Sequence, residues 1–140
     1  MSIRKSFPQY LDQIDFIKVN KIAKSFADHI ESHFEKIADI LLEYESFEVV
    51  KDEYDRTIDL LRSLHENEKY FVLRINVVTA FLPRNQPLYA FSCFVIIPSL
   101  MAKSVHFRIP HSMKAFFPRL LEVLVLINFF QILLFQKRKD

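Results

Sequence analysis

Cys93 and the pair His29 and His33 are the side chains whose types could support nucleophilic or metal chemistry. Cys93 lies between Phe91 and Phe94 in an apolar segment, where a buried thiol stays protonated and unreactive. His29 and His33 are four residues apart, a spacing that could place two metal ligands on one helix face. No third histidine or cysteine lies close to them in the sequence, so a solvated helix face is the better interpretation. We therefore predict neither a metal site nor a cysteine nucleophile.

Two further polar residues stand at changes of chain direction within residues 80–112. Asn85 is the centre of a corner (residues 83–87) in which two prolines flank Arg-Asn-Gln, directly after a strand-like run. Arg108 lies near the end of a second strand-like run that closes on Pro110. By themselves these residues indicate only a turn asparagine and a surface charge after a strand.

The composition limits the classes of function open to the chain. Its 140 residues suffice for one domain with its own core, and the 51% of apolar residues is typical of a globular protein rather than a disordered one. The chain contains no glycine, so it cannot hold a glycine-rich phosphate loop or a G-x-G-x-x-G dinucleotide motif. Without glycine, we expect every tight turn to use Asn, Asp, Pro or Ser.

Charge is distributed unevenly along the chain. Residues 1–69 carry 15 acidic and 10 basic side chains, whereas residues 70–140 carry 2 acidic and 9 basic ones. A basic half could face nucleic acid, anionic lipid or a phosphate-bearing ligand. Because the one dense basic cluster is residues 137–139, we expect no nucleic-acid partner.

The sequence favours a cytoplasmic location. Cys93 is the single cysteine, which excludes an internal disulfide and indicates a reducing compartment. Residues 1–20 contain several charges and no continuous apolar stretch, so we expect no secretory signal. The longest apolar run, residues 123–135, is interrupted by Asn128 and Gln131 and falls short of the roughly 18 residues that a membrane span needs.

Apolar residues at helical spacing predict two amphipathic helices. The first covers residues 20–45, with apolar residues every three or four positions and charged residues on the opposite side. Ser46 and Phe47 interrupt the pattern, and a second helix follows. Its apolar face consists of Val50, Tyr54, Ile58, Leu61, and Leu64 or His65.

The period then changes to that of strands. Residues 70–75 and 77–82 are rich in β-branched and aromatic residues. Asn76 between them could adopt a left-handed conformation. The two runs could therefore form either one bent strand or two short strands. Residues 88–97 are predicted as a buried helix that stops near Pro98.

A last strand and a last helix complete the prediction. The strand covers residues 105–109, and Ser112 is a candidate N-cap for a helix that begins near Met113. Pro118 is compatible with that helix only in its first turn. Residues 120–135 are apolar nearly all round, which implies burial against another part of the protein.

Together these elements predict an α/β protein, or an α+β protein if the chain is a fragment. The elements are two amphipathic helices, a strand pair and the start of a β-α-β dinucleotide-binding unit. We expect a single incomplete domain over residues 1–140, made of a lead-in (1–17), a helical pair (18–68), and strands that begin a cofactor-binding part (69–140). A single β-α-β unit would leave strand edges open, so we expect the opening of a larger fold.

The order of these elements and the corner sequence resemble the amino-terminal part of the aldehyde dehydrogenase superfamily, including its acyl-CoA reductase-like branches. In that family a Pro-x-Asn-x-Pro-Leu corner follows a pair of strands and precedes a helix rich in Leu and Ala. A strand that ends in a basic residue and proline comes next. Residues 83–88 and 105–110 match these two features, and the resemblance extends over residues 15–126.

The resemblance implies an NAD(P)-dependent oxidoreductase of aldehyde or acyl groups. Asn85 matches the asparagine whose side-chain amide stabilises the oxyanion formed when a cysteine thiolate attacks the substrate carbonyl. Arg108, or Ile109 in an alternative register, falls near the lysine that contacts the adenosine ribose of NAD or NADP. The family's nucleophilic cysteine, general-base glutamate and glycine-rich cofactor loop have no counterpart in this sequence. We therefore expect a truncated or frameshifted chain that is inactive alone.

Two other interpretations are open. The first is a small helical membrane-associated or protein-interaction module, because the apolar residues 120–135 precede the basic residues 137–139. The second is an accessory subunit that associates with itself, or docks on an intact homologous dehydrogenase, through its exposed strands.

Overall fold

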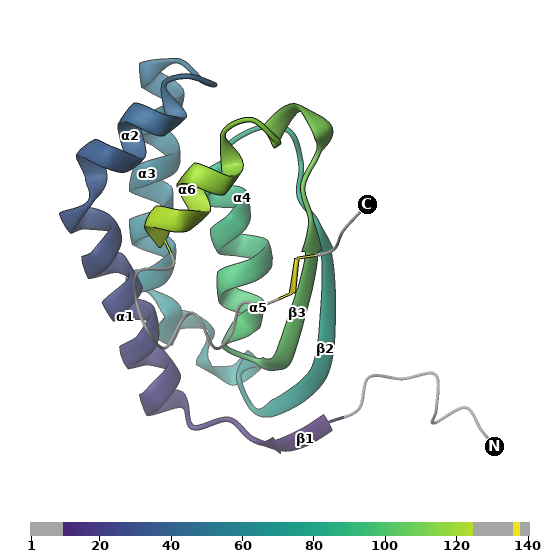
Figure 1. The fold of residues 1–140 in the computed structure, drawn as a ribbon. Coiled ribbons are helices and arrows are strands. Elements are labelled where there is room, and N and C mark those ends of the chain that lie inside the picture. Colours follow the sequence, from purple (N-terminus) through teal and green to yellow (C-terminus); the bar gives the residue numbers. More distant parts are fainter. Residues whose placement is uncertain (1–9, 125–135, 138–140) are drawn as a thin grey trace.

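The computed structural model describes residues 10–124 and 136–137, which form a mixed α+β fold (Figure 1). The helices and strands are β1 (Tyr10–Gln13), α1 (Phe16–Ser32), α2 (Phe34–Leu41), α3 (Phe47–Arg62), β2 (Leu73–Phe81), α4 (Pro87–Phe91), α5 (Ile97–Ser99), β3 (Ala102–Arg108), α6 (Phe117–Leu124) and β4 (Gln136–Lys137). Two 3₁₀ turns, Leu64–Tyr70 and His111–Met113, and a π-helical turn, Ser92–Ile96, lie between them.

The strands form a four-stranded sheet in the order β1-β2-β3-β4. β2 and β3 run parallel, with Val77 paired with Ser104 and Phe81 with Arg108, and a helix containing α4 and α5 connects them. The order strand, helix, parallel strand agrees with the predicted order of elements. β1 pairs antiparallel with β2, and β4 pairs parallel with β3, so a short strand lies at each edge of this unit.

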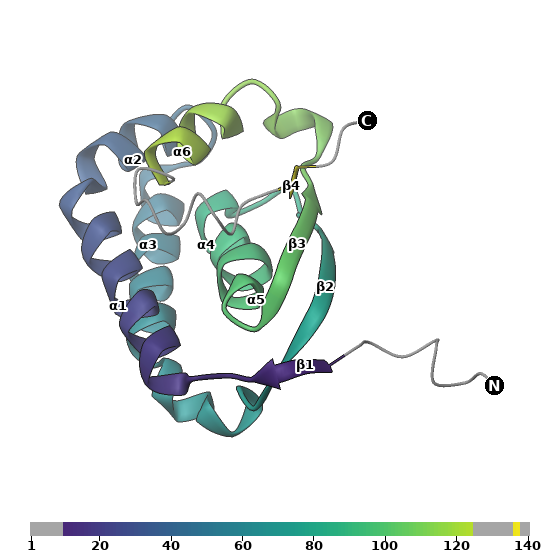
Figure 2. The same ribbon diagram turned by 60° about the horizontal axis from the view of Figure 1, so that its bottom comes forward.

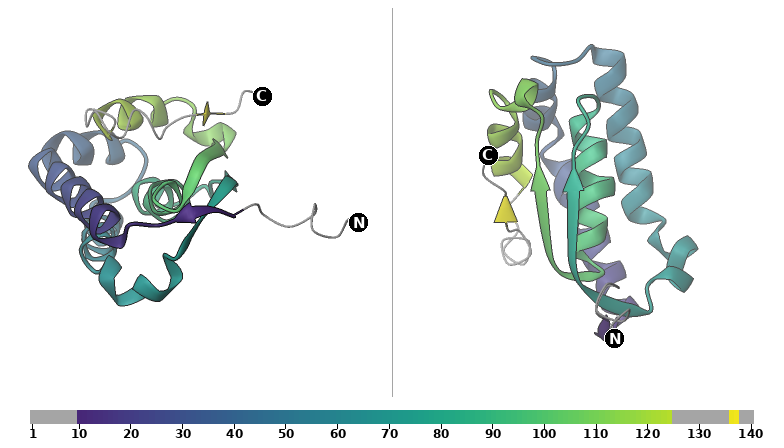
Figure 3. Two further views of the ribbon diagram at one scale, coloured as in Figure 1. Left: turned by 90° about the horizontal axis from the view of Figure 1, so that it is seen from below. Right: turned by 90° about the vertical axis from the view of Figure 1, so that its right-hand side faces the viewer.

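The helices lie on one side of the sheet in two layers (Figures 1 and 2). The helix containing α4 and α5 packs directly on β2 and β3, and α1, α2, α3 and α6 surround it on the far side (Figure 3). One cluster of buried apolar side chains extends through the layers. At its centre the rings of Phe91, Phe107 and Phe117 contact one another with centroid separations of 5.5, 5.6 and 6.4 Å.

Residues 1–17 were predicted as a lead-in, but a strand and the start of a helix lie within this range. Residues 10–13 form β1, and the Ile14 amide donates to the Val72 carbonyl at 2.7 Å. α1 already begins at Phe16, after its N-cap Asp15. The pairing of β1 with β2 joins segments far apart in the chain, so the local sequence carries no signal for it.

The helix predicted over residues 20–45 is two helices, α1 and α2, that meet at His33. The Ser32 hydroxyl donates to the His29 carbonyl at 3.0 Å, and Nδ1 of His33 lies 2.9 Å from the same oxygen. These local contacts compete with the helical hydrogen bonds, and His33 leaves helical geometry at φ −114° and ψ 21°. α2 ends at Leu41, before the predicted boundary, whereas α3 corresponds to the second predicted helix.

β2 is one continuous strand, so the alternative of two short strands is wrong. Tyr70 ends a 3₁₀ turn, and Phe71 is buried with its ring centroid 5.8 Å from that of Phe16. Asn76 lies inside β2 rather than at a bend. In residues 10–124 and 136–137 the residue with a left-handed backbone is Gln86, at φ 49°. The expectation that tight turns would use Asn, Asp, Pro or Ser is therefore wrong at Gln86.

The buried helix predicted over residues 88–97 is present as α4, the π-helical turn and α5. Within it the Ile97 amide donates to the Ser92 carbonyl, one residue further back than in an α-helix. This wider turn changes the hydrogen-bond register just before Pro98, which has no amide hydrogen to donate. The helix therefore ends at Ser99, close to the predicted stop.

The last helix begins later than predicted. Ser112 is not its N-cap but lies in a 3₁₀ turn, with its hydroxyl 3.3 Å from the Tyr44 hydroxyl. α6 starts at Phe117, which places Pro118 in the first turn as expected.

α6 packs against α2 and buries Leu120, Val123 and Leu124. The rest of the predicted apolar segment, residues 125–135, lies outside the described residues. In the part of the chain that the structure describes, no helix combines the length and the apolar character needed to cross a membrane.

Candidate functional site

The corner (residues 83–87) connects the carboxyl end of β2 to α4. Arg84 and Asn85 are exposed at its tip, and the left-handed conformation of Gln86 turns the chain into α4. Pro87 occupies the first helical position, where no amide hydrogen is needed. The candidate oxyanion residue Asn85 therefore faces solvent from a tight connection.

Side chains from the connection between α2 and α3 hold one side of the corner. The Tyr44 hydroxyl donates to the Arg84 carbonyl, while its ring lies 4.4 Å from that of Phe116. The Gln86 amide donates to Glu45 Oε1 at 3.0 Å. Because these partners come from a distant part of the chain, tertiary contacts fix the shape of the corner.

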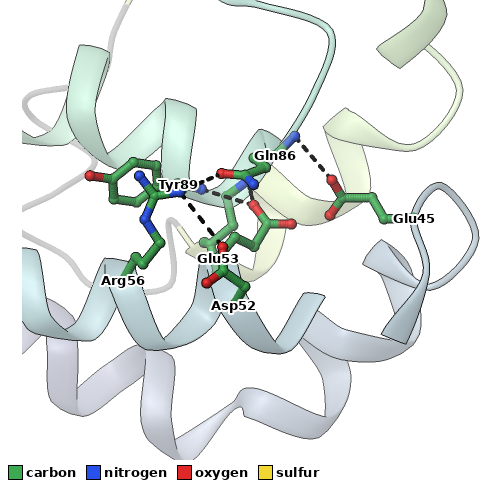
Figure 4. A network of polar contacts seen from close by, with 7 residues as sticks. Glu45, Asp52, Glu53, Arg56, Gln86 and Tyr89 are labelled. Atoms are coloured by element: carbon green, nitrogen blue, oxygen red, sulfur yellow. Dashed lines mark hydrogen bonds and ion pairs between the residues drawn. The ribbon is translucent and has the colours of Figure 1, made fainter. Parts of the chain in front are cut away.

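α3 holds the other side of the corner (Figure 4). Glu53 Oε1 accepts the amides of Leu88 at 2.8 Å and Tyr89 at 3.0 Å, which caps the first turn of α4. The Arg56 guanidinium donates to Gln86 Oε1 at 3.0 Å and lies 4.2 Å from the centre of the Tyr89 ring. The start of α4 is thus attached to two successive turns of α3.

The surroundings of Glu53 favour the uncharged form of its carboxyl. Burial raises the pKa of Glu53 to about 9, and a hydrogen bond with the Glu45 carboxyl and the negative charge of Glu45 act in the same direction. The amides of Tyr89 and Leu88 favour the charged form but do not offset the burial. Burial and the neighbouring Glu45 therefore both favour the uncharged form of the Glu53 carboxyl.

Arg108 is the last residue of β3 and pairs in register with Phe81, the last residue of β2. The Leu82 amide donates to the Arg108 carbonyl at 3.0 Å, and the Arg108 guanidinium lies 5.8 Å from the centre of the Phe81 ring. Because β2 and β3 are parallel, Arg108 and the corner with Asn85 lie at the same end of the sheet, where both strands have their carboxyl ends. Ile109, the alternative position, is partly buried against the core.

Cys93 lies one helical turn after Tyr89 and is half-buried. Burial raises the pKa of its thiol, while a hydrogen bond with Tyr89 and the positive charge of Arg56 act in the opposite direction. The thiol stays protonated at neutral pH, as expected from the sequence. The charged side chain that acts on this thiol is Arg56 on α3, and Cys93 is not at the strand ends.

The interpretation of His29 and His33 as a solvated face needs correction. Both side chains are half-buried and their ring centroids are 4.2 Å apart. His29 Nε2 lies 2.9 Å from the Val123 carbonyl, so this histidine connects α1 to α6. Over residues 10–124 and 136–137, no three His, Cys, Asp or Glu side chains group so that they could hold a metal ion.

A pocket of about 410 Å³ lies at the opposite end of the strands from Asn85 and Arg108. Across it Arg74 forms an ion pair with Asp12 at 2.8 Å, and this hydrogen bond holds the pKa of Asp12 below its ordinary value. Lys103 also lines the pocket, at the start of β3. We do not place the candidate site there, because ligands of parallel sheets bind at the carboxyl ends of the strands.

The chain has no match among protein-family models, curated proteins or solved structures. Any functional assignment therefore depends on the corner and the strand ends. The likeness to aldehyde dehydrogenases stays an interpretation of sequence motifs.

Glu45 and Glu53 are the residues of this region that the sequence analysis missed. Glu53 lies on the same buried face of α3 as Val50, Thr57 and Leu61. An acidic residue at a position of that apolar face is a signal for a buried carboxyl with specific partners. Glu45 lies in a helix connection and carries no comparable signal.

Proposed function

We propose that the chain is the amino-terminal part of an NAD(P)-dependent oxidoreductase of aldehyde or acyl groups, similar to aldehyde dehydrogenases. One observation carries this proposal: Asn85 follows β2 and Arg108 ends β3, so both lie at the carboxyl ends of two neighbouring parallel strands. Such strand ends are where open α/β sheets bind their ligands. A cytoplasmic, reducing compartment fits the single cysteine.

The attachment of the corner supports the role proposed for Asn85. Tyr44, Glu45 and Glu53 fix the backbone on both sides of it, while Asn85 itself is exposed. A side-chain amide on a fixed backbone needs little reorganisation when negative charge develops on a substrate oxygen. Asn85 would therefore donate a hydrogen bond to that oxygen.

Arg108 would contribute to cofactor binding. An arginine guanidinium presents several hydrogen-bond donors to ribose hydroxyls or phosphate oxygens. Its position over Phe81 limits the orientations that the side chain can take. NAD and NADP both offer these acceptor groups.

The chain alone would not complete the reaction. The chemistry of the family needs a cysteine thiolate, and Cys93 is protonated and lies against α3. We expect no aldehyde turnover by the purified chain. Its contribution would be the oxyanion donor and part of the cofactor surface.

The proposal can be tested by titrating the ¹⁵N-labelled chain with NADH and with NADPH. We expect amide shift changes that cluster at residues 82–88 and 108–110. Arg108→Ala should abolish them, whereas Lys103→Ala, at the other end of β3, should leave them unchanged. Shift changes scattered over the surface, or equal in Arg108→Ala, would count against a cofactor surface at this end of the sheet.

A second candidate function is a protein-interaction module. Leu73, Val77 and Phe81 are exposed apolar residues at every fourth position of β2. Because successive side chains of a strand point to opposite faces, these three share one face of the sheet. Such a face could support self-association or docking on a homologous dehydrogenase. Sedimentation would show a dimer that Val77→Lys dissociates, and a monomer at all concentrations would exclude self-association.

A further inference from the structure

Glu53 places a carboxyl group in the interior between α3 and α4. The residue is fully buried, and its Oε1 accepts the amides of Leu88 and Tyr89. Its Oε2 is also buried and has no hydrogen-bond donor among the described residues. A carboxylate in this position would leave half of its negative charge unsatisfied in a medium of low polarity.

Glu45 repeats this arrangement from the other side of the corner. Its Oε1 accepts the Gln86 amide, and its Oε2 is buried without a donor in the part of the chain that the structure describes. Figure 4 shows the carboxyl groups of Glu45 and Glu53 beside each other under Gln86, and Glu45 raises the pKa of Glu53. We call Glu45 and Glu53 the acid pair. Two carboxylates this close would repel each other strongly.

The charged groups around the acid pair are engaged elsewhere. On α3, Arg56 donates to Gln86 Oε1 and lies 3.6 Å from the Asp52 carboxylate (Figure 4). α4 contributes the uncharged Tyr89, and the corner contributes Arg84, which is exposed. Within residues 10–124, neither Glu45 nor Glu53 forms an ion pair with a lysine or arginine.

We propose that Glu53 carries a proton on Oε2, donates it to Glu45 Oε2, and thereby makes the acid pair the attachment that positions the corner and the start of α4 on α3. One proton satisfies both buried Oε2 atoms, while the two Oε1 atoms accept the amides of Gln86, Leu88 and Tyr89. The pair carries a single negative charge in this form. The inference concerns the fold of the corner and does not depend on the function proposed for Asn85.

Loss of this proton should release the corner. With both carboxyls charged, repulsion would separate Glu45 from Glu53 and weaken the hydrogen bonds to the three amides. The corner and the first turn of α4 would then open locally while the apolar core keeps the rest folded. The acid pair therefore makes the position of the corner sensitive to alkaline pH.

The experiment is a pH titration of the full chain with ¹³C-labelled glutamate side chains, followed by NMR. We expect one glutamate carboxyl to titrate far above the ordinary value of 4.5. This transition should disappear in Glu53→Gln, move to lower pH in Glu45→Gln, and persist in Glu48→Gln, the same change at an exposed position of α3. A wild-type chain whose glutamates all titrate below pH 7, or a transition that persists in Glu53→Gln, would overturn the proposal.

Amide hydrogen exchange tests the positioning role separately. The protection factors of the Gln86, Leu88 and Tyr89 amides should fall by about tenfold or more across the carboxyl transition. Those of Phe107 in β3 should not change with it. Equal protection of the three amides on both sides of the transition would show that the acid pair does not hold the corner.

Discussion

The Tyr44 hydroxyl donates to the main-chain carbonyl of Arg84 and so connects the end of the α2 region to the tip of the corner. The same hydroxyl lies 3.3 Å from the Ser112 hydroxyl, in the 3₁₀ turn after β3. Tyr44 therefore links the two connections that follow the parallel strands. Tyr44, a side chain from the helical layer, thus holds the end of the sheet that carries Asn85 and Arg108.

Tyr44→Phe should destabilise the chain by about 1 kcal/mol, the usual net contribution of one hydrogen bond. The substitution keeps the ring and its contact with Phe116, so the decrease in the free energy of unfolding measures the contribution of the hydroxyl group. Urea unfolding followed by circular dichroism gives the free energy of unfolding. Tyr70→Phe is a suitable control, because Tyr70 is 62% exposed and its change should stay within about 0.5 kcal/mol. Equal effects of the two substitutions would argue against the link through Arg84.

Glu53→Ala should lower the free energy of unfolding by about 3 kcal/mol. It leaves the buried amides of Leu88 and Tyr89 without an acceptor and opens a cavity between α3 and α4. Glu53→Gln should cost less than about 1 kcal/mol at pH 7, because its carbonyl oxygen replaces Oε1 and its amide can donate to Glu45. Chemical denaturation of both variants measures the difference. If alanine and glutamine are equally destabilising, the hydrogen bonds of Glu53 do not determine its contribution.

Stability should fall as the pH rises above the ordinary glutamate pKa. The folded chain keeps a proton on Glu53 up to about pH 9, whereas the unfolded chain releases it near 4.5. Between these values the folded state binds more protons, so the free energy of unfolding decreases with pH, by at most about 1.4 kcal/mol per pH unit. Urea midpoints measured across this range should show the decrease in the wild type and in Glu48→Gln. A flat profile in the wild type, or an unchanged slope in Glu53→Gln, would contradict this assignment.

The features that were predicted correctly depend on neighbours in the sequence. The 3.6-residue period predicted the helices that form α1 and α3, and the alternation of strands and helix around the corner predicted the order β2, α4–α5, β3. On α3 the period gave the buried Val50 and Leu61 but not the buried Glu53. Pro118 lies in the first turn of α6, since the restriction on proline is local. These signals need no knowledge of the rest of the fold.

The features that were missed depend on contacts between distant segments. β1 exists because β2 offers it an edge, and Gln86 takes a left-handed conformation where Glu45 and Arg56 bind its amide and side chain. The break at His33 arises from side chains that bind a helical carbonyl, which an apolar period cannot reveal. At the candidate site the position of Asn85 in a corner could be read from the sequence, but the contacts that fix this corner could not.

The Cys93 thiol should react slowly with iodoacetamide. Burial raises its pKa above the ordinary value of 9.0, and only the thiolate is nucleophilic. At pH 8 we expect alkylation at least about tenfold slower in the folded chain than in denaturant. Because the charge of Arg56 and the hydrogen bond with Tyr89 favour the thiolate, Arg56→Ala and Tyr89→Phe should each slow the reaction further.

Lys51→Ala provides the control for removing a positive charge from α3, because Lys51 pairs with Asp55 and does not act on Cys93. Alkylation rates measured against pH in the wild type should still be rising at pH 9. A rate that is constant from pH 7 upward would mean that Cys93 is already a thiolate. That outcome would place a competent nucleophile next to Arg56 and move the search for catalysis from the strand ends to the contact between α3 and α4.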